Sequence, residues 1–294
     1  MNRTLYLECN SGISGDMIVA ALLDLGADEQ VLRETLKSLP LSGYTVEISR
    51  VKKAGIDCCD FHVKLDTDNH DHDMEYLYGH EHGHHRDHEH DHHGDDHHRG
   101  HDHNPDHTHD HQGNHEHHHP HEHRGLKEIE TVLGAGSLTE GALCLAMKIF
   151  RILAEAESKA HGVPMEQVHF HEVGAVDSIV DIAAAAICFD NLGVDQVILP
   201  RISEGYGTVR CQHGILSVPV PAASNIMEKY GLTIHMTEVK GELITPTGAA
   251  IAAAVRTTEE LPAEFKIRKI GMGAGKRQYE LPGILRAMLI EELP

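Results

Sequence analysis

The sequence predicts an α/β or α+β protein: a composite globular core interrupted by a long, disordered, histidine-rich insert. Strand-like and helix-like segments alternate along most of the 294 residues, and a chain of that length can bury a sizeable core. Segment 67–124, in contrast, has almost no aliphatic side chain to bury. We therefore expect 1–66 to form an N-terminal strand, loop and helix part of the core, 67–124 to be the insert, and 125–294 to form the α/β remainder of the core.

The N-terminal part should begin with a short buried strand from Leu5 to Cys9. A glycine-rich turn and a helix that ends at Gly26 follow, and a second helix is expected from Glu29 to Leu39. Two β-leaning runs come next, YTVEISRV and FHVKL, with KKAGIDCCD separating them. The folded sequence is expected to stop near Leu65.

The insert is dominated by metal-binding side chains, with 23 histidines and 14 acidic residues from His70 to His123. Such a segment cannot offset its ordering entropy, so we expect a coil with a root-mean-square span of roughly 40 Å. Imidazole suits nickel, zinc, copper and cobalt, so loose metal binding is expected. The histidines that we assign to it are His80, His82, His84, His85, His88, His90, His92 and His93. A solvated spacer with no role remains the alternative.

Helices and strands should alternate after the insert. LTEGALCLAMKIFRILAEAESKA has helical spacing, with Thr139 or Ser137 placed to cap it. EVGAVDSIVDIAAAAICFDNLG is a second helix that Gly193 closes. The strands DQVILPRI, LTIHM and FKIRKIG then alternate with the helices PAASNIMEKYG and PTGAAIAAAVRT.

Composition excludes some classes of partner. The formal net charge of -21 argues against binding nucleic acid or a membrane surface through bulk charge. The longest apolar run, 183–189, is far shorter than the ~20 residues of a membrane span. The six cysteines show no CxxC spacing and the start shows no apolar signal region, so we expect a reduced, cytoplasmic protein. The sequence contains no GxSxG or HExxH motif, so a hydrolase or a zincin metalloprotease is not the expected class of enzyme.

The stretch VHFHEVGAVDSIVD carries a candidate metal site. His169 and His171 lie two apart in an expected extended segment, so both rings point to one side. Glu172 follows at the entrance of a helix on which Asp177 and Asp181 stack one turn apart, and a bound cation would relieve their repulsion. Alternatively, Asp177 merely suits the positive end of the helix and His171 caps it.

Glycine-containing loops supply candidate phosphate-binding groups, because converging backbone N–H groups attract anions. The candidates are Ser11, Gly12, Ser14, Gly15 and Asp16 in SGISGDM, and Thr245, Thr247 and Gly248 in ITPTGAA. Thr245 can also cap a helix that begins at Pro246, and a plain capped helix is the alternative for either loop.

KIGMGAGKRQ adds local positive charge at Lys276 and Arg277, which a phosphate would require in an acidic protein. Its glycine spacing fits neither GxGxxG nor Walker A, so a glycine-rich strand turn is the alternative. His213 lies in another turn, within EGYGTVRCQHGILSVPVPA, where a structural and a catalytic role are equally open.

Together and in this order, SGISGDM, the histidine-rich insert, VHFHEVGAVDSIVDI, GYGTVRCQHGILSVPVPA and ITPTGAA resemble the LarC family of nickel insertion proteins. The resemblance implies insertion of Ni²⁺ into pyridinium-3,5-bisthiocarboxylic acid mononucleotide, which makes the nickel-pincer nucleotide of lactate racemase. It further implies a cyclometallase of the lyase class that consumes CTP with Mg²⁺ or Mn²⁺.

Longer members continue past the IEELP with which this sequence ends, into a domain to which CTP binding is assigned. The expected partners are therefore the pyridinium mononucleotide, a separate C-terminal LarC domain that would complete a half-enzyme, and lactate racemase.

In this chain the resemblance suggests His169 or Glu172 as the base for the ring proton. His169, His171, Asp177 and Asp181 would be metal ligands, and the glycine-rich loops with Lys276 and Arg277 would hold phosphate. Two other hypotheses stay open: a non-catalytic nickel storage protein or metallochaperone, and a nucleotide-binding scaffold whose insert is incidental.

Overall fold

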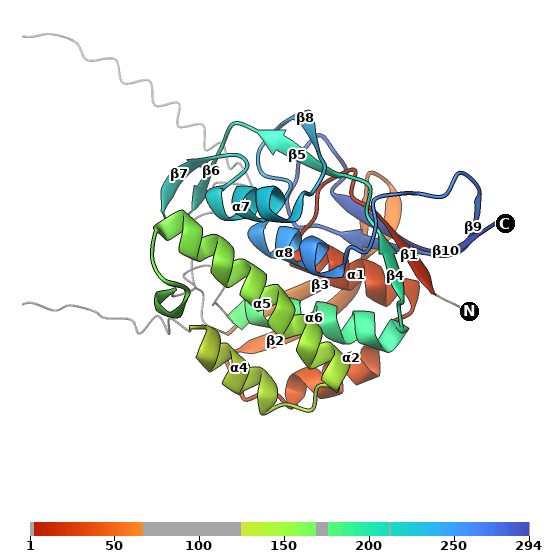
Figure 1. The fold of residues 1–294 in the computed structure, drawn as a ribbon. Helices are drawn as coiled ribbons and strands as arrows, with labels where there is room; N and C mark the ends of the chain where they lie inside the picture. The colour runs from red at the N-terminus through yellow and green to blue at the C-terminus, as the bar shows by residue number, and fades with distance from the viewer. Residues whose placement is uncertain (1–2, 67–124, 169–175, 212, 294) are drawn as a thin grey trace, which may run out of the picture.

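The protein is built around one mixed six-stranded sheet, with strands in the order β2-β3-β9-β10-β1-β4 (Figure 1). The computed structural model describes residues 3–66, 125–168, 176–211 and 213–293. The sheet strands are β1 (Thr4–Glu8), β2 (Tyr44–Lys53), β3 (Ile56–Leu65), β4 (Gln196–Ile198), β9 (Phe265–Ala274) and β10 (Ile284–Glu292). β1 pairs antiparallel with β10 and parallel with β4, so strands from both ends of the sequence are neighbours. This mixed α/β architecture confirms the predicted fold class.

Helices pack on the sheet in two stacked layers, an inner one that contacts the strands and an outer one that contacts the inner helices. The helices are α1 (Gly15–Leu25), α2 (Glu29–Lys37), α4 (Leu126–Gly134), α5 (Glu140–His161), α6 (Val176–Leu192), α7 (Pro221–Tyr230) and α8 (Pro246–Val255), with a short 3₁₀ helix η1 (Met165–Gln167). α1 packs directly on β3, β9 and β10, and α6 packs beside it on β3. α5 lies outside this layer against α6, α7 and α8, as Figure 1 shows.

Two small sheets stand at the edge of the molecule. β5 (Ile202–Tyr206) pairs in parallel with β8 (Ile234–Lys240). β6 (Thr208–Cys211) and β7 (Gly214–Ser217) form a hairpin whose turn holds His213.

Several predicted boundaries are confirmed by their capping contacts. α1 ends at Gly26 and α6 at Gly193, with φ values of 112° and 58° that favour glycine. The Thr139 hydroxyl accepts a hydrogen bond from the amide of Ala142 at 3.1 Å, as a cap of α5 should. Thr245 caps α8 in the same way, with Pro246 as its first residue.

Other expectations were wrong in detail. KKAGIDCCD does not separate two strands, because only Ala54 and Gly55 form the turn and β2 and β3 each extend over 10 residues. DQVILPRI is not one strand but contains β4 and the start of β5, which belong to different sheets. The second helix ends at Lys37 rather than Leu39. β10 was not predicted at all.

The glycines of KIGMGAGKRQ lie mainly within β9, where they allow α1 to approach the sheet. A Cβ at Gly271 would lie 2.2 Å from the Ala21 carbonyl oxygen, and one at Gly273 would lie 2.0 Å from that of Met17. Both distances are far inside van der Waals contact, so only glycine fits. These two glycines therefore serve helix packing.

The six cysteines are all described, and all are free thiols. No helix in the described residues is long and apolar enough to cross a membrane. The histidine-rich segment 67–124, including every histidine from His80 to His93 that we assigned to metal, lies outside the described residues.

Candidate functional site

Two of the predicted loops are locked together by their backbones. The amide of Ile13 donates to the carbonyl oxygen of Leu243 at 2.9 Å, and the amide of Thr245 donates to that of Ile13 at 3.1 Å. A Cβ at Gly12 would lie 2.1 Å from the Leu243 oxygen, and one at Gly248 would lie 2.2 Å from the Ile13 oxygen. The space beside these glycines is thus filled by protein backbone, and the loops form one rigid unit with Ser11 and Thr247 buried in it.

The start of α1 faces the predicted metal-binding helix. A Cβ at Gly15 would lie 2.7 Å from Oδ2 of Asp181, so that carboxylate sits directly over the glycine. Ser14 donates a short hydrogen bond from its hydroxyl to Asp16. The structure therefore brings the SGISGDM loop and α6 together through Gly15, Asp16 and Asp181.

The carboxylates at this point raise one another's proton affinity. Burial, then the charges of Asp16 and Asp177, hold the pKa of Asp181 well above its usual range. Burial also raises the pKa of Asp16, although the Ser14 hydrogen bond and the Lys276 charge oppose it. Asp177 and Asp181 lie one turn apart on α6, as predicted. We call Asp16, Asp60, Asp177, Asp181 and Lys276 the carboxylate cluster.

Lys276 and Arg277 each have an internal acidic partner. Lys276 forms a close ion pair with Asp60 on β3. Arg277 places Nη1 2.7 Å from both Oε2 and the backbone oxygen of Glu242. Lys276 thus belongs to the carboxylate cluster, whereas Arg277 braces the segment that leads into Leu243 and Thr245.

The remaining predicted ligands lie outside the described residues. His169, His171 and Glu172 lie in 169–175, outside the described residues and immediately before α6 in the sequence. In the part of the chain that the structure describes, no three histidine, cysteine or acidic side chains form a group that could hold a metal ion. Asp177 and Asp181 are thus the described members of the predicted metal site.

Sequence reasoning missed a buried carboxyl group next to these loops. Glu204 on β5 is 0% exposed, and its Oε1 accepts hydrogen bonds from the amides of Gly205, Leu243 and Ile244 at 2.8, 2.7 and 3.3 Å. Burial raises its pKa to about 7. Glu204 therefore anchors the Leu243 segment that holds Ile13. No motif marks it, because its burial arises only from tertiary packing.

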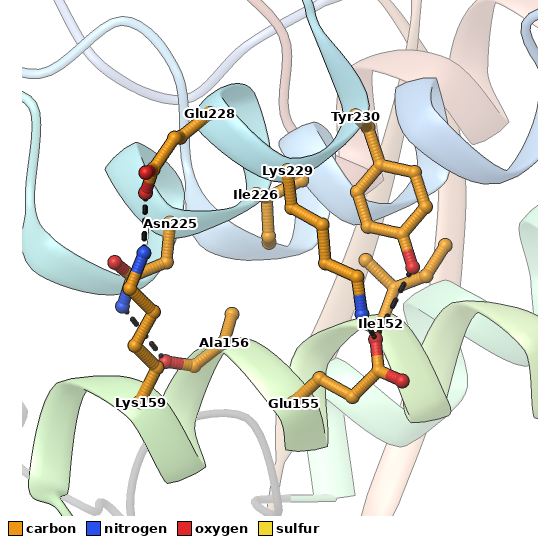
Figure 2. A pocket seen from close by; sticks show the side chains of 9 residues that line it. All are labelled: Ile152, Glu155, Ala156, Lys159, Asn225, Ile226, Glu228, Lys229 and Tyr230. Atoms are coloured by element: carbon orange, nitrogen blue, oxygen red, sulfur yellow. Dashed lines mark hydrogen bonds and ion pairs between the residues drawn. The ribbon is translucent and has the colours of Figure 1, made fainter.

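A groove of about 380 Å³ between α5 and α7 is not part of this site. Figure 2 shows ion pairs bridging it, including Lys229 to Glu155 at 2.6 Å and Lys159 to Glu228. Tyr230 also donates to Glu155 at 3.2 Å. None of the predicted site residues lines this groove, which we interpret as a solvated helix-helix seam.

Comparisons with known proteins agree over almost the whole chain. The sequence model of a family described as "Nickel insertion protein" matches residues 5–293. The chain is 47% identical to the "Pyridinium-3,5-bisthiocarboxylic acid mononucleotide nickel insertion protein" of Alkaliphilus metalliredigens, over 99% of this chain and 61% of that protein. It is 45% identical to the protein of that name from Clostridium acetobutylicum, over 99% and 64% of the two chains.

A "Putative nickel insertion protein" of Geobacter is 38% identical over 98% of this chain. No solved structure matches. The chain spans a little over three fifths of the length of these relatives. With a family match that runs from β1 to the end of β10, the chain belongs to the nickel insertion protein family.

Proposed function

We propose that this chain binds nickel and takes part in its insertion into pyridinium-3,5-bisthiocarboxylic acid mononucleotide, forming the nickel-pincer nucleotide. The observation that carries the proposal is the match of 99% of the chain to two proteins named for that insertion. Asp177 and Asp181 support it, because two like charges one turn apart on α6 repel each other unless a cation lies between them.

The reaction needs a base. Nickel binds two thiocarboxylate sulfurs and replaces a proton on the ring, so one carbon-hydrogen bond breaks and one carbon-nickel bond forms. The electron pair stays on carbon, and the proton passes to a protein group. His169 or Glu172 is our candidate for that base.

Nickel would be held by His169 and His171 together with Asp177 and Asp181 before it is transferred. Imidazole is a preferred ligand of nickel, and the carboxylates add negative charge. A cation between Asp177 and Asp181 would also relieve the repulsion between them, which adds to burial and the Asp16 charge in raising the pKa of Asp181. The entering ion would therefore displace protons, so binding should weaken as the pH falls.

The phosphate of the mononucleotide would lie on the Lys276 side of the carboxylate cluster. Asp16 and Asp181 stand beside the start of α1, so their charges oppose an anion there and offset the attraction of the helix N-terminus. Lys276 can share its charge between Asp60 and a phosphate. Of the predicted contacts Ser11, Gly12, Ser14, Gly15, Asp16, Thr245, Thr247, Gly248, Lys276 and Arg277, we therefore propose Lys276 as the one that binds the phosphate. Protein backbone fills the space beside Gly12 and Gly248, and Asp16 would repel an anion.

The proposal extends to a CTP-dependent cyclometallase of the lyase class, with Mg²⁺ or Mn²⁺ beside the nucleotide. We further propose that a separate C-terminal LarC domain is the partner that supplies the CTP site. Lactate racemase would receive the product, and the setting would be cytoplasmic.

Reconstitution tests this function. Purified chain, Ni²⁺ and the bisthiocarboxylate mononucleotide are mixed with CTP and Mg²⁺ or Mn²⁺, with and without the C-terminal LarC domain. The organometallic product is followed by mass spectrometry. Product that appears only with the domain identifies a half-enzyme, and product that never appears in any mixture contradicts the proposal.

A nickel storage protein or metallochaperone is the second candidate, favoured by the 23 histidines of 70–123. The storage hypothesis predicts that the chain binds nickel tightly but that no mixture of the reconstitution yields organometallic product. Equilibrium dialysis distinguishes the nucleotide-binding scaffold hypothesis from the other two. That hypothesis predicts that a variant lacking 70–123 binds nucleotide but does not bind metal tightly.

A further inference from the structure

Two histidines from distant parts of the chain meet at the end of α5. His161 is the last residue of that helix, and His213 lies in the turn of the β6–β7 hairpin. Their ring centroids are 4.9 Å apart and the ring planes are inclined at 59°. Figure 1 shows the hairpin standing beside this end of α5. Neither ring has a place in the proposed insertion chemistry.

A carboxylate one helical turn earlier contacts one of these rings. Oε2 of Glu157 lies 3.4 Å from Nε2 of His161, and the two side chains are 17% and 34% exposed. In proteins, a carboxylate at one ring nitrogen commonly orients a histidine whose other nitrogen holds a metal. The pair therefore has a partly buried acidic group beside it, and an opening to solvent through the exposed His213.

The spacing of the rings fits a shared metal ion. With metal-nitrogen bonds of about 2.1 Å and angles of about 90 to 110° at the metal, two imidazole centres lie roughly 4.6 to 5.3 Å apart. The observed 4.9 Å falls inside that range. The inclination of 59° lies between the offset-stacked and the edge-to-face arrangements that packed rings prefer.

We propose that His161 and His213 form a surface site for a borderline divalent transition-metal ion such as nickel, with Glu157 orienting His161. Two imidazoles give a chelate, and water would complete the coordination shell. A two-ligand site leaves positions open, which suits an ion that must exchange rather than stay. The inference does not rest on the proposed insertion activity.

Site-resolved chemical protection tests the site in the full chain, whose many other histidines would obscure a bulk titration. Diethyl pyrocarbonate labels exposed imidazoles, and peptide mass spectrometry gives the rate at each histidine with and without Ni²⁺ at a buffered free concentration. At ten times the midpoint for binding, we expect the labelling rates of His161 and His213 to fall about tenfold by mass action. His62 and His235 are exposed internal controls and should keep their rates.

The decisive measurement is the protection of each histidine in a variant that lacks the other. In His213→Gln, Ni²⁺ should no longer protect His161 at the concentration that protects it in the wild type, and in His161→Gln it should no longer protect His213. The matched variant His235→Gln should leave protection of both rings unchanged, and Mg²⁺ should protect neither.

Protection of His161 that survives His213→Gln would overturn the proposal, because the ring would then be shielded by something other than a shared ion. Equal protection at His62 and His235 would overturn it as well, as would unchanged labelling of the pair in saturating Ni²⁺.

Discussion

Asp181 shows how a single side chain sets up the candidate site. It is held over Gly15 of α1, next to Asp16 and one turn after Asp177, so its charged form is opposed by two neighbours and by burial. The spacing of Asp177 and Asp181 could be predicted from helical periodicity alone. The sequence could not predict that Asp16 and Asp60 belong to the same cluster, because their positions depend on how α1 and β3 pack against α6.

Replacing the Asp181 carboxylate should therefore stabilise the fold while harming nickel binding. We expect Asp181→Asn to raise the free energy of unfolding by about 1 kcal/mol in the presence of a chelator. The measurement is urea unfolding, with Glu238→Gln, an exposed carboxylate on β8, as the control. A comparable loss of stability would mean that attraction to Lys276 outweighs the repulsion from Asp16 and Asp177.

Glu204 should make stability depend on pH between about 4.5 and 7. Its folded pKa of about 7 lies above the ordinary value of 4.5, so the fold favours the neutral acid. This contribution is fully present below pH 4.5 and is lost as the pH rises toward 7. At about 1.4 kcal/mol per pH unit, the loss is about 3 kcal/mol.

Glu204→Gln should remove that dependence, because glutamine keeps an oxygen for the three amides but does not titrate. Urea unfolding from pH 5 to 8 should show the variant gaining on the wild type as the pH rises, whereas Glu238→Gln follows the wild type throughout. Parallel curves for Glu204→Gln and the wild type would refute the assignment.

The elements differ in how well the sequence predicts them. The helices α1, α5 and α6 could be predicted because capping residues and apolar periodicity mark their ends. β10 could not, because a short apolar run that is buried in a sheet has no periodicity to separate it from a helix. DQVILPRI likewise conceals a change of sheet between β4 and β5 that only long-range pairing determines.

Contact between α1 and β9 should be the part of the core most sensitive to added volume. Gly273→Ala would place a methyl group 2.0 Å from the Met17 oxygen and 2.6 Å from the Ala21 nitrogen. We expect the free energy of unfolding to fall by about 2 to 3 kcal/mol in thermal or urea unfolding, as for other overpacked sites.

Gly134→Ala is the matched control. It meets no atom within 4 Å at the end of α4, so it should be neutral or gain up to about 1 kcal/mol from helix propensity. Equal effects of the two variants would contradict the packing argument.

At the scale of the whole molecule, segments on both sides of 67–124 share one sheet, since β1 pairs with β4 and β10, and β3 pairs with β9. The composition predicts that the histidine-rich segment runs from 67 to 124, and β3 ends at Leu65 and α4 begins at Leu126. Composition alone does not tell whether that segment or the carboxylate cluster binds the nickel ion that is inserted. We propose that the histidine-rich segment supplies nickel and that the carboxylate cluster binds it selectively at the site of insertion.

The most direct test is the rate of nickel insertion in the reconstituted system as a function of free nickel. Three proteins are compared: the full chain, a variant lacking 70–123, and Asp177→Asn/Asp181→Asn. The account predicts that the deletion raises the nickel concentration needed for half the maximal rate but leaves that maximum unchanged, whereas the double substitution lowers the maximum at least tenfold. A deletion that abolishes insertion at saturating nickel, with the double substitution fully active, would contradict it.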